Sequence, residues 1–389
     1  MSTMTAAWVL RSGPTDHYES GSLHLEDFSL PAVGPTDVLV EPLVGCWEGN
    51  MTHALQRRPV DICRQRNEAA VVLGNAGVVR VLQPGSAITE FKEGDLAYVF
   101  GNAKPWERFG YMRQALAYDC PQTMGALAKK SVMPAHSLVR LPEQRSFTLS
   151  EWAAFSLRFV TAWSNWKVAL GCYRTQVGAD ENPCPNVWAW GGGVSLAELM
   201  LARAAGCKVT MLTSKPKRLA LLSSLGIAVV DRSAFPNLRY SEDRYAKDRE
   251  YRDAYQESER AFLKVVKERT SGQGVDIFID NIGAPVARAT LKALGTCGVM
   301  TTCGWYGGMD IRAVRGIEAI SRHLFVHTHY ARREEGVAAL AFAVANPWWR
   351  PPLAGAPARW EDIGTLAEAQ LHGTDDSWFP LFQVADHLS

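Results

Sequence analysis

Short runs of apolar residues, separated by turn residues, characterise the first part of the chain. We expect strands over residues 37–42, 77–82 and 94–100, because each run is rich in Val, Leu or aromatic side chains and is bounded by turn residues. Pro84-Gly85 and Glu93-Gly94 separate these runs and supply the turns that a small barrel requires. The region from about residue 38 to residue 142 is therefore interpreted as a β-rich domain.

The pattern changes at about residue 187, where an apolar strand, a glycine turn and a helix follow one another in a repeated order. Expected strands cover residues 187–190, 209–213 and 228–231. After the first strand, a turn at residues 191–195 leads into helical periodicity at residues 196–205, which Gly206 closes. Such alternation is typical of βαβ units, so we predict an α/β second domain with a doubly wound parallel sheet.

Composition agrees with two folded domains. The chain has 389 residues, 47% of them hydrophobic, which by the usual domain size allows about two cores. Its 41 Lys and Arg residues balance 40 Asp and Glu residues without a basic cluster, so nucleic acid is excluded as a partner. No apolar run approaches the roughly 18 residues of a membrane helix. Residues 1–5 lack a basic segment followed by an apolar core, so we expect no membrane contact and a cytoplasmic protein.

The most informative segment is Gly191-Gly192-Gly193-Val194, which lies between an expected strand and an expected helix. Glycines let the backbone turn sharply and approach a pyrophosphate closely, while the following helix directs its N-terminus at the phosphate charge. A turn that only packs is the alternative. Because a second strand ends about 20 residues later, where such folds select the ribose, we predict that this turn binds a dinucleotide.

The end of the second expected strand indicates which dinucleotide binds. Sites that prefer NAD place Asp or Glu there to accept hydrogen bonds from the ribose hydroxyls, whereas this chain has Ser214, Lys215 and Arg218. Serine donates a hydrogen bond and the two cations make charge-assisted contacts to phosphate, so these residues favour NADPH. A solvated basic helix start is the alternative, but cations at a helix N-terminus oppose the macrodipole unless an anion binds.

Two further segments carry a resemblance to a known family. Residues 274–283 and residues 298–304 resemble strands and turns of the medium-chain dehydrogenase/reductase superfamily, and the resemblance covers nearly the whole chain. In that superfamily such turns line the nicotinamide side of the cofactor. The resemblance therefore implies that further residues bind the cofactor, namely Thr161, Asn281, Gly283, Cys303 and Gly304. Turns that only pack are again the alternative.

Within this superfamily the chain resembles the crotonyl-CoA carboxylase/reductase branch. An insertion at about residues 233–268, rich in Tyr, Arg, Asp and Glu, has the length and place of an insertion in that branch. Physically, we expect a solvated surface helix there. Residues 326–331, which follow the expected strands, are similar to the branch's Gly-Ser-His-Phe-Ala, so His329 takes the place of its active-site histidine.

The same resemblance supplies catalytic candidates. In carboxylating members, an Asn, a Glu and a His hold the carbon dioxide that traps the α-carbanion. His329 matches the His, Asp119 is similar to the Glu of the family's Gly-Tyr-Glu-Thr-Pro, and Asn50 is an offset counterpart of its Asn-Tyr-Asn. A turn cap before Pro121 is the alternative for Asp119, and a satisfied core histidine is the alternative for His329.

The residues themselves argue against a metal. Zinc-dependent relatives hold their catalytic zinc with a Cys, a His and a second Cys. Cys46 matches the first ligand, but Leu73 and Leu157 stand in the places of the other two. The eight cysteines form no CxxC pair. We therefore expect no metal site.

The absence of these ligands directs the expected chemistry. Without a Lewis acid, a simple ketone loses the group that polarises its oxygen, whereas a conjugated thioester already accepts hydride at its β carbon. We therefore expect NADPH-dependent reduction of an enoyl thioester of CoA or a carrier protein. Three alternatives stay open: reductive carboxylation of an enoyl-CoA, zinc-free reduction of a quinone or carbonyl, and a homologue that binds nucleotide without turnover.

The resemblance also implies the arrangement of the domains. A GroES-like β-rich catalytic domain covers residues 1–165 and 346–389, and a Rossmann domain covers residues 166–345. Residues 379–384 resemble the strand that returns to the first domain. A small-molecule substrate is expected in the cleft between the domains, and a homodimer is implied.

Overall fold

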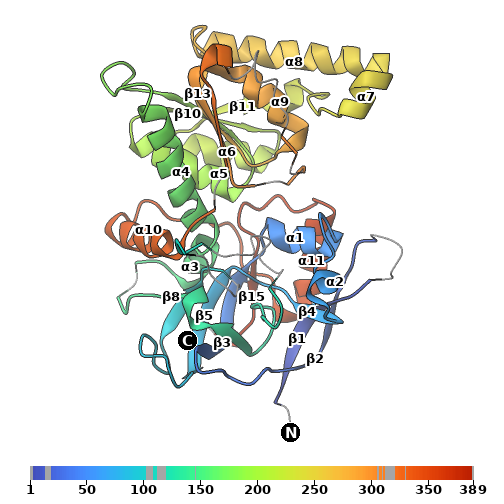
Figure 1. Cartoon of the computed structure of the whole chain (residues 1–389), viewed down its shortest axis with the longest axis vertical. Coiled ribbons are helices and arrows are strands. Elements are labelled where there is room, and N and C mark those ends of the chain that lie inside the picture. The colour runs from blue at the N-terminus through green and yellow to red at the C-terminus, as the bar shows by residue number, and fades with distance from the viewer. Residues whose placement is uncertain are drawn as a thin grey trace. The chain divides into compact units, whose positions relative to one another are not determined.

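The structure is a computed structural model that describes most of the chain. The described residues are 3–13, 19–101, 108–111, 120–144, 146–304, 306–308, 310–311, 320–328 and 330–387. They form two compact units, the first made of Met1–Val160 with Ala331–Ser389 and the second of Thr161–Tyr330 (Figure 1).

The first unit is built from antiparallel strands. Its larger sheet has the order β15-β3-β5-β6-β8, with β7 also paired to β3, and its smaller sheet has the order β2-β1-β4. The strands are β1 (Met4–Arg11), β2 (Leu23–Ser29), β3 (Asp37–Cys46), β4 (Ala70–Val72), β5 (Gly77–Pro84), β6 (Leu96–Val99), β7 (Ser131–Pro134), β8 (Leu138–Arg140) and β15 (Leu381–Gln383). Alternate residues of β3 point into a core of Val38, Val40, Val79 and Val81. The expected β-rich domain is confirmed, and β15 pairs with β3 as the returning strand.

The second unit is a parallel sheet with helices. Its strand order is β11-β10-β9-β12-β13-β14, and every neighbouring pair is parallel. The strands are β9 (Asn186–Trp190), β10 (Lys208–Thr213), β11 (Ala228–Asp231), β12 (Val275–Asp280), β13 (Leu294–Thr302) and β14 (Phe325–Thr328). Numbered from β9, this is the order 3-2-1-4-5-6 of the Rossmann fold, so the predicted doubly wound sheet is confirmed. The direction of winding reverses between β9 and β12.

The helices of the second unit connect these strands. They are α4 (Arg158–Arg174), which begins at the end of the first unit, α5 (Gly193–Ala204), α6 (Pro216–Ser224), α7 (Glu242–Lys247), α8 (Arg249–Arg269) and α9 (Ala284–Ala293). Helix α5 begins three residues before the expected start at residue 196, because Gly192 already acts as its N-cap. Residues 326–328, expected to follow the last strand, belong to the last strand itself, since β14 pairs with β13 as far as Thr328.

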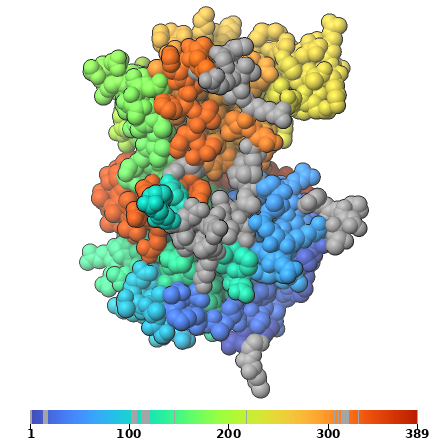
Figure 2. Space-filling model, viewed as in Figure 1, coloured from blue at the N-terminus to red at the C-terminus, as the bar shows by residue number. Residues whose placement is uncertain are grey.

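The insertion at residues 233–268 contains α7 and most of α8, and Figure 2 shows it in yellow at the surface of the second unit. The expected surface helix is present, but one face of α8 is buried through Tyr255, Phe262 and Val266. Glu259 on that face pairs with Lys292 of α9 at 2.6 Å. The insertion therefore packs against the sheet and is paired by charge with α9.

Helix α10 (Arg333–Ala345) belongs to the first unit, whereas the sequence interpretation placed the return to the first domain at residue 346. The reason is local contact. Tyr98 Oη on β6 donates to the Gly336 carbonyl at 2.8 Å, and Arg333 Nε donates to the His136 carbonyl at 3.1 Å. These bonds attach the start of α10 to the antiparallel sheet.

Helices α1 (Gly49–Gln56), α2 (Ile62–Arg66), α3 (Leu149–Phe155) and α11 (Ile363–Leu371) complete the first unit. None of the helices in the described ranges is long and apolar enough to cross a membrane.

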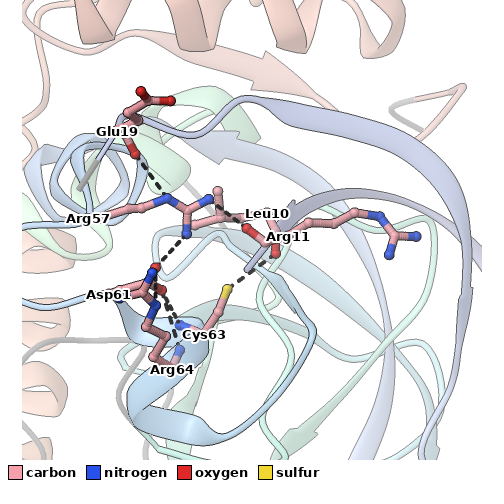
Figure 3. A network of polar contacts seen from close by, with 7 residues as sticks. All are labelled: Leu10, Arg11, Glu19, Arg57, Asp61, Cys63 and Arg64. Atoms are coloured by element: carbon pink, nitrogen blue, oxygen red, sulfur yellow. Dashed lines mark hydrogen bonds and ion pairs between the residues drawn. The ribbon is translucent and has the colours of Figure 1, made fainter. Parts of the chain in front are cut away.

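A buried arginine fixes the end of α1 (Figure 3). Arg57, the C-cap of α1, donates from Nη1 to Asp61 Oδ2 at 2.8 Å, from Nε to the Glu19 carbonyl at 3.1 Å and from Nη2 to the Arg11 carbonyl at 2.7 Å. Asp61 in turn caps α2, because its Oδ1 accepts from the Cys63 backbone N–H at 3.0 Å. One guanidinium thus joins β1, α1 and α2.

We expect Arg57→Met to lower the free energy of unfolding by about 3–5 kcal/mol, because it leaves the Asp61 carboxylate buried without its main partner. Arg64→Met is the matched control, since Arg64 contacts the same carboxylate at 3.7 Å but has a side chain that is 33% exposed. Its loss should cost about 1 kcal/mol or less. Urea unfolding of both variants measures the difference, and equal losses would contradict the assignment.

Candidate functional site

The turn from β9 to α5 lies where the winding of the sheet reverses. Its first two glycines, Gly191 and Gly192, have different structural roles. Gly191 has a φ of +134°, and a Cβ on it would lie 2.5 Å from Ser195 Oγ and 3.1 Å from Asn281 Cβ. A Cβ on Gly192 would meet no atom within 4 Å. Gly192 caps α5 without a side-chain bond, and the first turn, which begins at Gly193, has no acidic residue. The fold requires Gly191, whereas Gly192 leaves open space beside the N-terminus of α5.

The neighbouring turn, from β12 to α9, is held by a buried carboxyl group. Asp280 accepts from the Ile282 and Gly283 backbone N–H groups at 3.0 and 2.9 Å and from Thr290 Oγ1 at 2.7 Å. Burial raises the pKa of Asp280, and these donors offset part of the rise. Gly283, with a φ of +87°, is thus needed to form this turn.

Asn281 connects the glycine turn with the end of β13. Its Nδ2 donates to Ser195 Oγ at 2.9 Å, and its Oδ1 accepts from the Cys303 backbone N–H at 3.1 Å. A Cβ on Gly304 would lie 2.9 Å from Asn281 Cβ, so the two turns are in close contact. Burial holds the pKa of the Cys303 thiol well above its usual range, so Cys303 is a neutral thiol here. Four of the residues expected to bind the cofactor, Gly191, Asn281, Cys303 and Gly304, therefore lie together.

A polar network lies directly beneath this turn. Glu198 of α5 is fully buried and accepts from Asn165 Nδ2 of α4 at 2.9 Å. Burial raises the pKa of Glu198 to about 8, and the side chains of Asn165 and Asn281 offset part of the rise. Asn165 Oδ1 accepts from Thr301 Oγ1 at 2.8 Å, and that hydroxyl is 3.3 Å from His327 Nδ1. The network joins α5, α4, β13 and β14.

The basic residues expected at the ribose end lie at the same edge of the sheet. Met211 of β10 lies opposite Ala189 of β9 in a parallel register, so the strands end side by side. Ser214 is exposed, and Lys215 and Arg218 are half-buried. Lys215 is the N-cap of α6, whose first turn has no acidic residue. This edge can accept a phosphate group.

Two other residues expected to bind the cofactor have less informative surroundings. Val194 is half-buried in the first turn of α5, and Thr161 is half-buried in α4. Val194 lies next to the glycine turn because it directly follows Gly193 in the chain.

In the first unit, Asn50 lies in the first turn of α1. Its backbone N–H donates to Glu48 Oε2 at 2.8 Å, and Glu48 Oε1 accepts from the Met51 backbone N–H at 3.1 Å. Burial raises the pKa of the Glu48 carboxyl, which the backbone donors partly offset. The other two catalytic candidates, Asp119 and His329, lie outside the described residues.

An arginine occupies one side of Cys46. Arg158 donates from Nη1 to Cys46 Sγ at 2.8 Å and from Nη2 to the Trp47 carbonyl, and its guanidinium carbon lies 5.7 Å from the centre of the Phe379 ring. Burial raises the pKa of Cys46, so its thiol stays neutral. No group of three His, Cys, Asp or Glu side chains in the described part of the chain could hold a metal ion. Instead, a half-buried cation donates to two neutral acceptors and interacts electrostatically with the Glu48 carboxyl group.

Three residues of these sites were not singled out by the sequence. Glu198 carried a signal, because it is the one charged residue in the apolar run of residues 196–202. Asn165 and Arg158 carried none, since their roles depend on partners 33 and 112 positions away in the chain.

Comparison with known proteins shows what this chain is similar to. Residues 193–342 match the zinc-binding dehydrogenase family. The chain is 23% identical over 315 residues to crotonyl-CoA reductase of Streptomyces collinus, which covers 74% of this chain but 65% of that relative, slightly less than two thirds of its length. A zinc-type alcohol dehydrogenase-like protein of Schizosaccharomyces pombe is 38% identical over 103 residues, covering 26% of this chain and 27% of that protein.

Solved structures share the fold over the whole chain. The crotonyl-CoA carboxylase/reductase AntE in complex with NADP superposes with a TM-score of 0.76 at 20% identity, covering 99% of this chain and 96% of that one. The 2-octenoyl-CoA carboxylase reductase CinF, in complex with NADP and 2-octenoyl-CoA, gives 0.78 at 19% identity, covering 100% and 90%. This likeness confirms a Rossmann domain combined with a GroES-like domain.

The two glycines give a matched pair of variants. We expect Gly191→Ala to lower the free energy of unfolding by about 2 kcal/mol, because its backbone conformation and its contact with Ser195 exclude a methyl group. Gly192→Ala should cost less than about 1 kcal/mol, since only its role as a helix cap is affected. Thermal unfolding measures both. A larger loss in the Gly192 variant than in the Gly191 variant would refute the assignment.

Proposed function

We propose that the protein is an NADPH-dependent oxidoreductase, because residues 193–342 match the zinc-binding dehydrogenase family. Its proposed reaction is hydride delivery to an activated carbon–carbon double bond, specifically that of an enoyl thioester. The observation that carries this proposal is the glycine turn after β9, which leaves open space where the winding of the sheet reverses. The basic residues that follow β10 lie beside it. Relatives that share the fold are crotonyl-CoA and 2-octenoyl-CoA carboxylase/reductases crystallised with NADP.

The residues present fit a dinucleotide phosphate. The open space at Gly192, where a Cβ would meet no atom within 4 Å, would let a pyrophosphate approach the N-terminus of α5. Ser214, Lys215 and Arg218 would hold the 2′-phosphate of NADPH, for which a carboxylate at the same place would be repulsive. The remaining residues proposed to contact the cofactor lie on its nicotinamide side or at helix N-termini. They are Thr161, Gly191, Gly193, Val194, Asn281, Gly283, Cys303 and Gly304.

When bound, NADPH would supply hydride from its nicotinamide ring. Addition of hydride to the β carbon of an enoyl thioester moves negative charge onto the thioester oxygen, and protonation of the α carbon then completes the reduction. The protein must provide a donor for that oxygen. In the first unit, Arg158 is held by Cys46 and Trp47 through two of its five N–H groups. We assign the Arg158 guanidinium as the donor to the substrate oxygen.

Reductive carboxylation is the second candidate, because the relatives named above carry both activities in their names. It would require a carbon dioxide site, for which Asn50, Asp119 and His329 are the proposed residues. Of these, Asn50 lies in the first turn of α1, where Glu48 holds its backbone. The functional test below therefore includes bicarbonate.

The setting of the enzyme is proposed on the same basis. The substrate is expected to be a CoA or carrier-protein thioester, as the 2-octenoyl-CoA complex of CinF suggests. By resemblance, we propose a homodimer in the cytoplasm.

We expect purified protein to oxidise NADPH in the presence of crotonyl-CoA, with a smaller rate for NADH because the 2′-phosphate contacts are lost. The assay follows absorbance of the reduced nicotinamide with crotonyl-CoA, with and without bicarbonate, and with a quinone. Gly192→Ala is the control, since its methyl group should block the pyrophosphate. Turnover with the quinone alone would overturn the thioester proposal, and NADPH binding without any turnover would favour a non-catalytic homologue.

Arg158→Gln should lower kcat with crotonyl-CoA by roughly 100-fold, the usual loss when one donor to a developing oxyanion is removed. Arg158→Lys should recover part of the activity because it restores the charge. NADPH affinity should stay unchanged in both variants, since the proposed cofactor contacts lie in the other unit. Arg140→Gln, at a side chain that is 58% exposed, is the surface control, and an unchanged kcat in Arg158→Gln would remove Arg158 from the reaction.

A further inference from the structure

Glu198 is a buried acid close to the proposed pyrophosphate site. It stands five residues after Gly193 in α5, and the rise of an α-helix places it about 7.5 Å further along the axis. Its side chain has no exposed surface. A carboxylic acid is unfavourable at this buried position, because an apolar residue would fill the same space without desolvating a carboxyl group.

The surroundings of Glu198 supply two amides and a thiol but no compensating charge. From α4, Asn165 donates to Oε2 at 2.9 Å, while Oε1 has no hydrogen-bond partner among the described residues. The Asn281 amide, one residue after β12, faces the carboxyl group, and so does the Cys303 thiol, one residue after β13. That thiol has a pKa well above its usual range and is neutral. No cation in the described part of the chain contributes to the pKa of Glu198.

The more distant titratable groups do not neutralise it either. His327 on β14 is connected to Glu198 through Thr301 and Asn165. Asp280 on β12 is occupied by its own turn, where it accepts from two backbone N–H groups and Thr290. The ionised form of Glu198 is therefore disfavoured, and its pKa is raised to about 8. Burial thus favours the protonated carboxyl group at neutral pH.

A dinucleotide at the N-terminus of α5 would strengthen this preference. Its pyrophosphate and a Glu198 carboxylate would be two negative charges separated by protein of low dielectric constant, which disfavours holding both at once. Ionisation would also offer Asn281 Nδ2 a stronger acceptor than Ser195 Oγ, its partner at 2.9 Å. Asn281 is the residue that holds the glycine turn against the end of β13.

We propose that Glu198 is a proton-linked positioning residue, which must carry a proton for the glycine turn to bind its dinucleotide. The inference rests on the proposed NADPH site but concerns a group that does not touch the cofactor. By linkage, affinity should be constant well below pH 8 and should fall by up to about tenfold per pH unit above it. Over that alkaline range, binding of one NADPH takes up as much as one proton.

The test is titration calorimetry of the full chain with NADPH at pH 7 and at pH 9, each in two buffers of different ionisation enthalpy. The wild type should take up almost no proton at pH 7 and a substantial fraction of one proton at pH 9, with weaker binding at pH 9. Glu198→Gln should take up none at either pH and bind with the same affinity at both. Cys207→Ala is the matched control and should keep the uptake, because this thiol is buried in the same unit but lies outside the proposed cofactor contacts.

The outcomes separate the two proposals. NADPH binding by the wild type without proton uptake at pH 9 would overturn the role of Glu198 and leave the cofactor assignment intact. Uptake that persists in Glu198→Gln would also overturn it. If no NADPH binds at either pH, the proposed function fails instead. Because the first measurement uses the wild type alone, the inference stays testable even if the glutamine variant does not fold, and Glu198→Met then provides the second neutral variant.

Discussion

The reversal of winding between β9 and β12 is the constraint on which the candidate site depends. Connections from these two strands leave the parallel sheet in opposite directions along it, so no connection crosses the edge between them. The N-terminus of α5 begins at that edge with its backbone N–H groups directed outward. The end of β10 brings its basic residues to the same edge, and the ends of β12 and β13 bring Asn281 and Cys303.

Hydrogen bonds beneath this edge hold the turns that follow β9 and β12 in place. Asp280 orders its own turn through backbone donors, while Asn281 and Asn165 each use the donor and the acceptor of one amide to join two elements. Neutral amides suit this purpose because they satisfy buried partners without adding charge. Glu198 departs from the pattern, and its proposed proton restores neutrality.

The sequence predicted those features that depend on local pattern. The apolar runs of the parallel strands, the glycine turn after Trp190 and the alternation of strand and helix are encoded within short segments, so the fold class could be inferred from them. The start of α5 was placed too late because the helical periodicity begins after Ser195, whereas the backbone becomes helical at Gly193. Arg158 and Asn165 could not be recognised, because each gains its role from a partner distant in the chain. Glu198 was visible in the sequence as a charged residue in an apolar run, but its raised pKa depends on burial, which the sequence alone does not show.

The contact between Arg158 and Cys46 has a consequence for how such a protein could acquire a metal. Supplying ligands at Leu73 and Leu157 would not be sufficient, because the thiol is neutral, buried and already accepts a hydrogen bond from a guanidinium. A divalent cation would meet a fixed positive charge beside its first ligand, and the thiol would have to lose its proton at the same time. A metal site at Cys46 would therefore require displacement of the guanidinium from the thiol as well as the addition of two ligands.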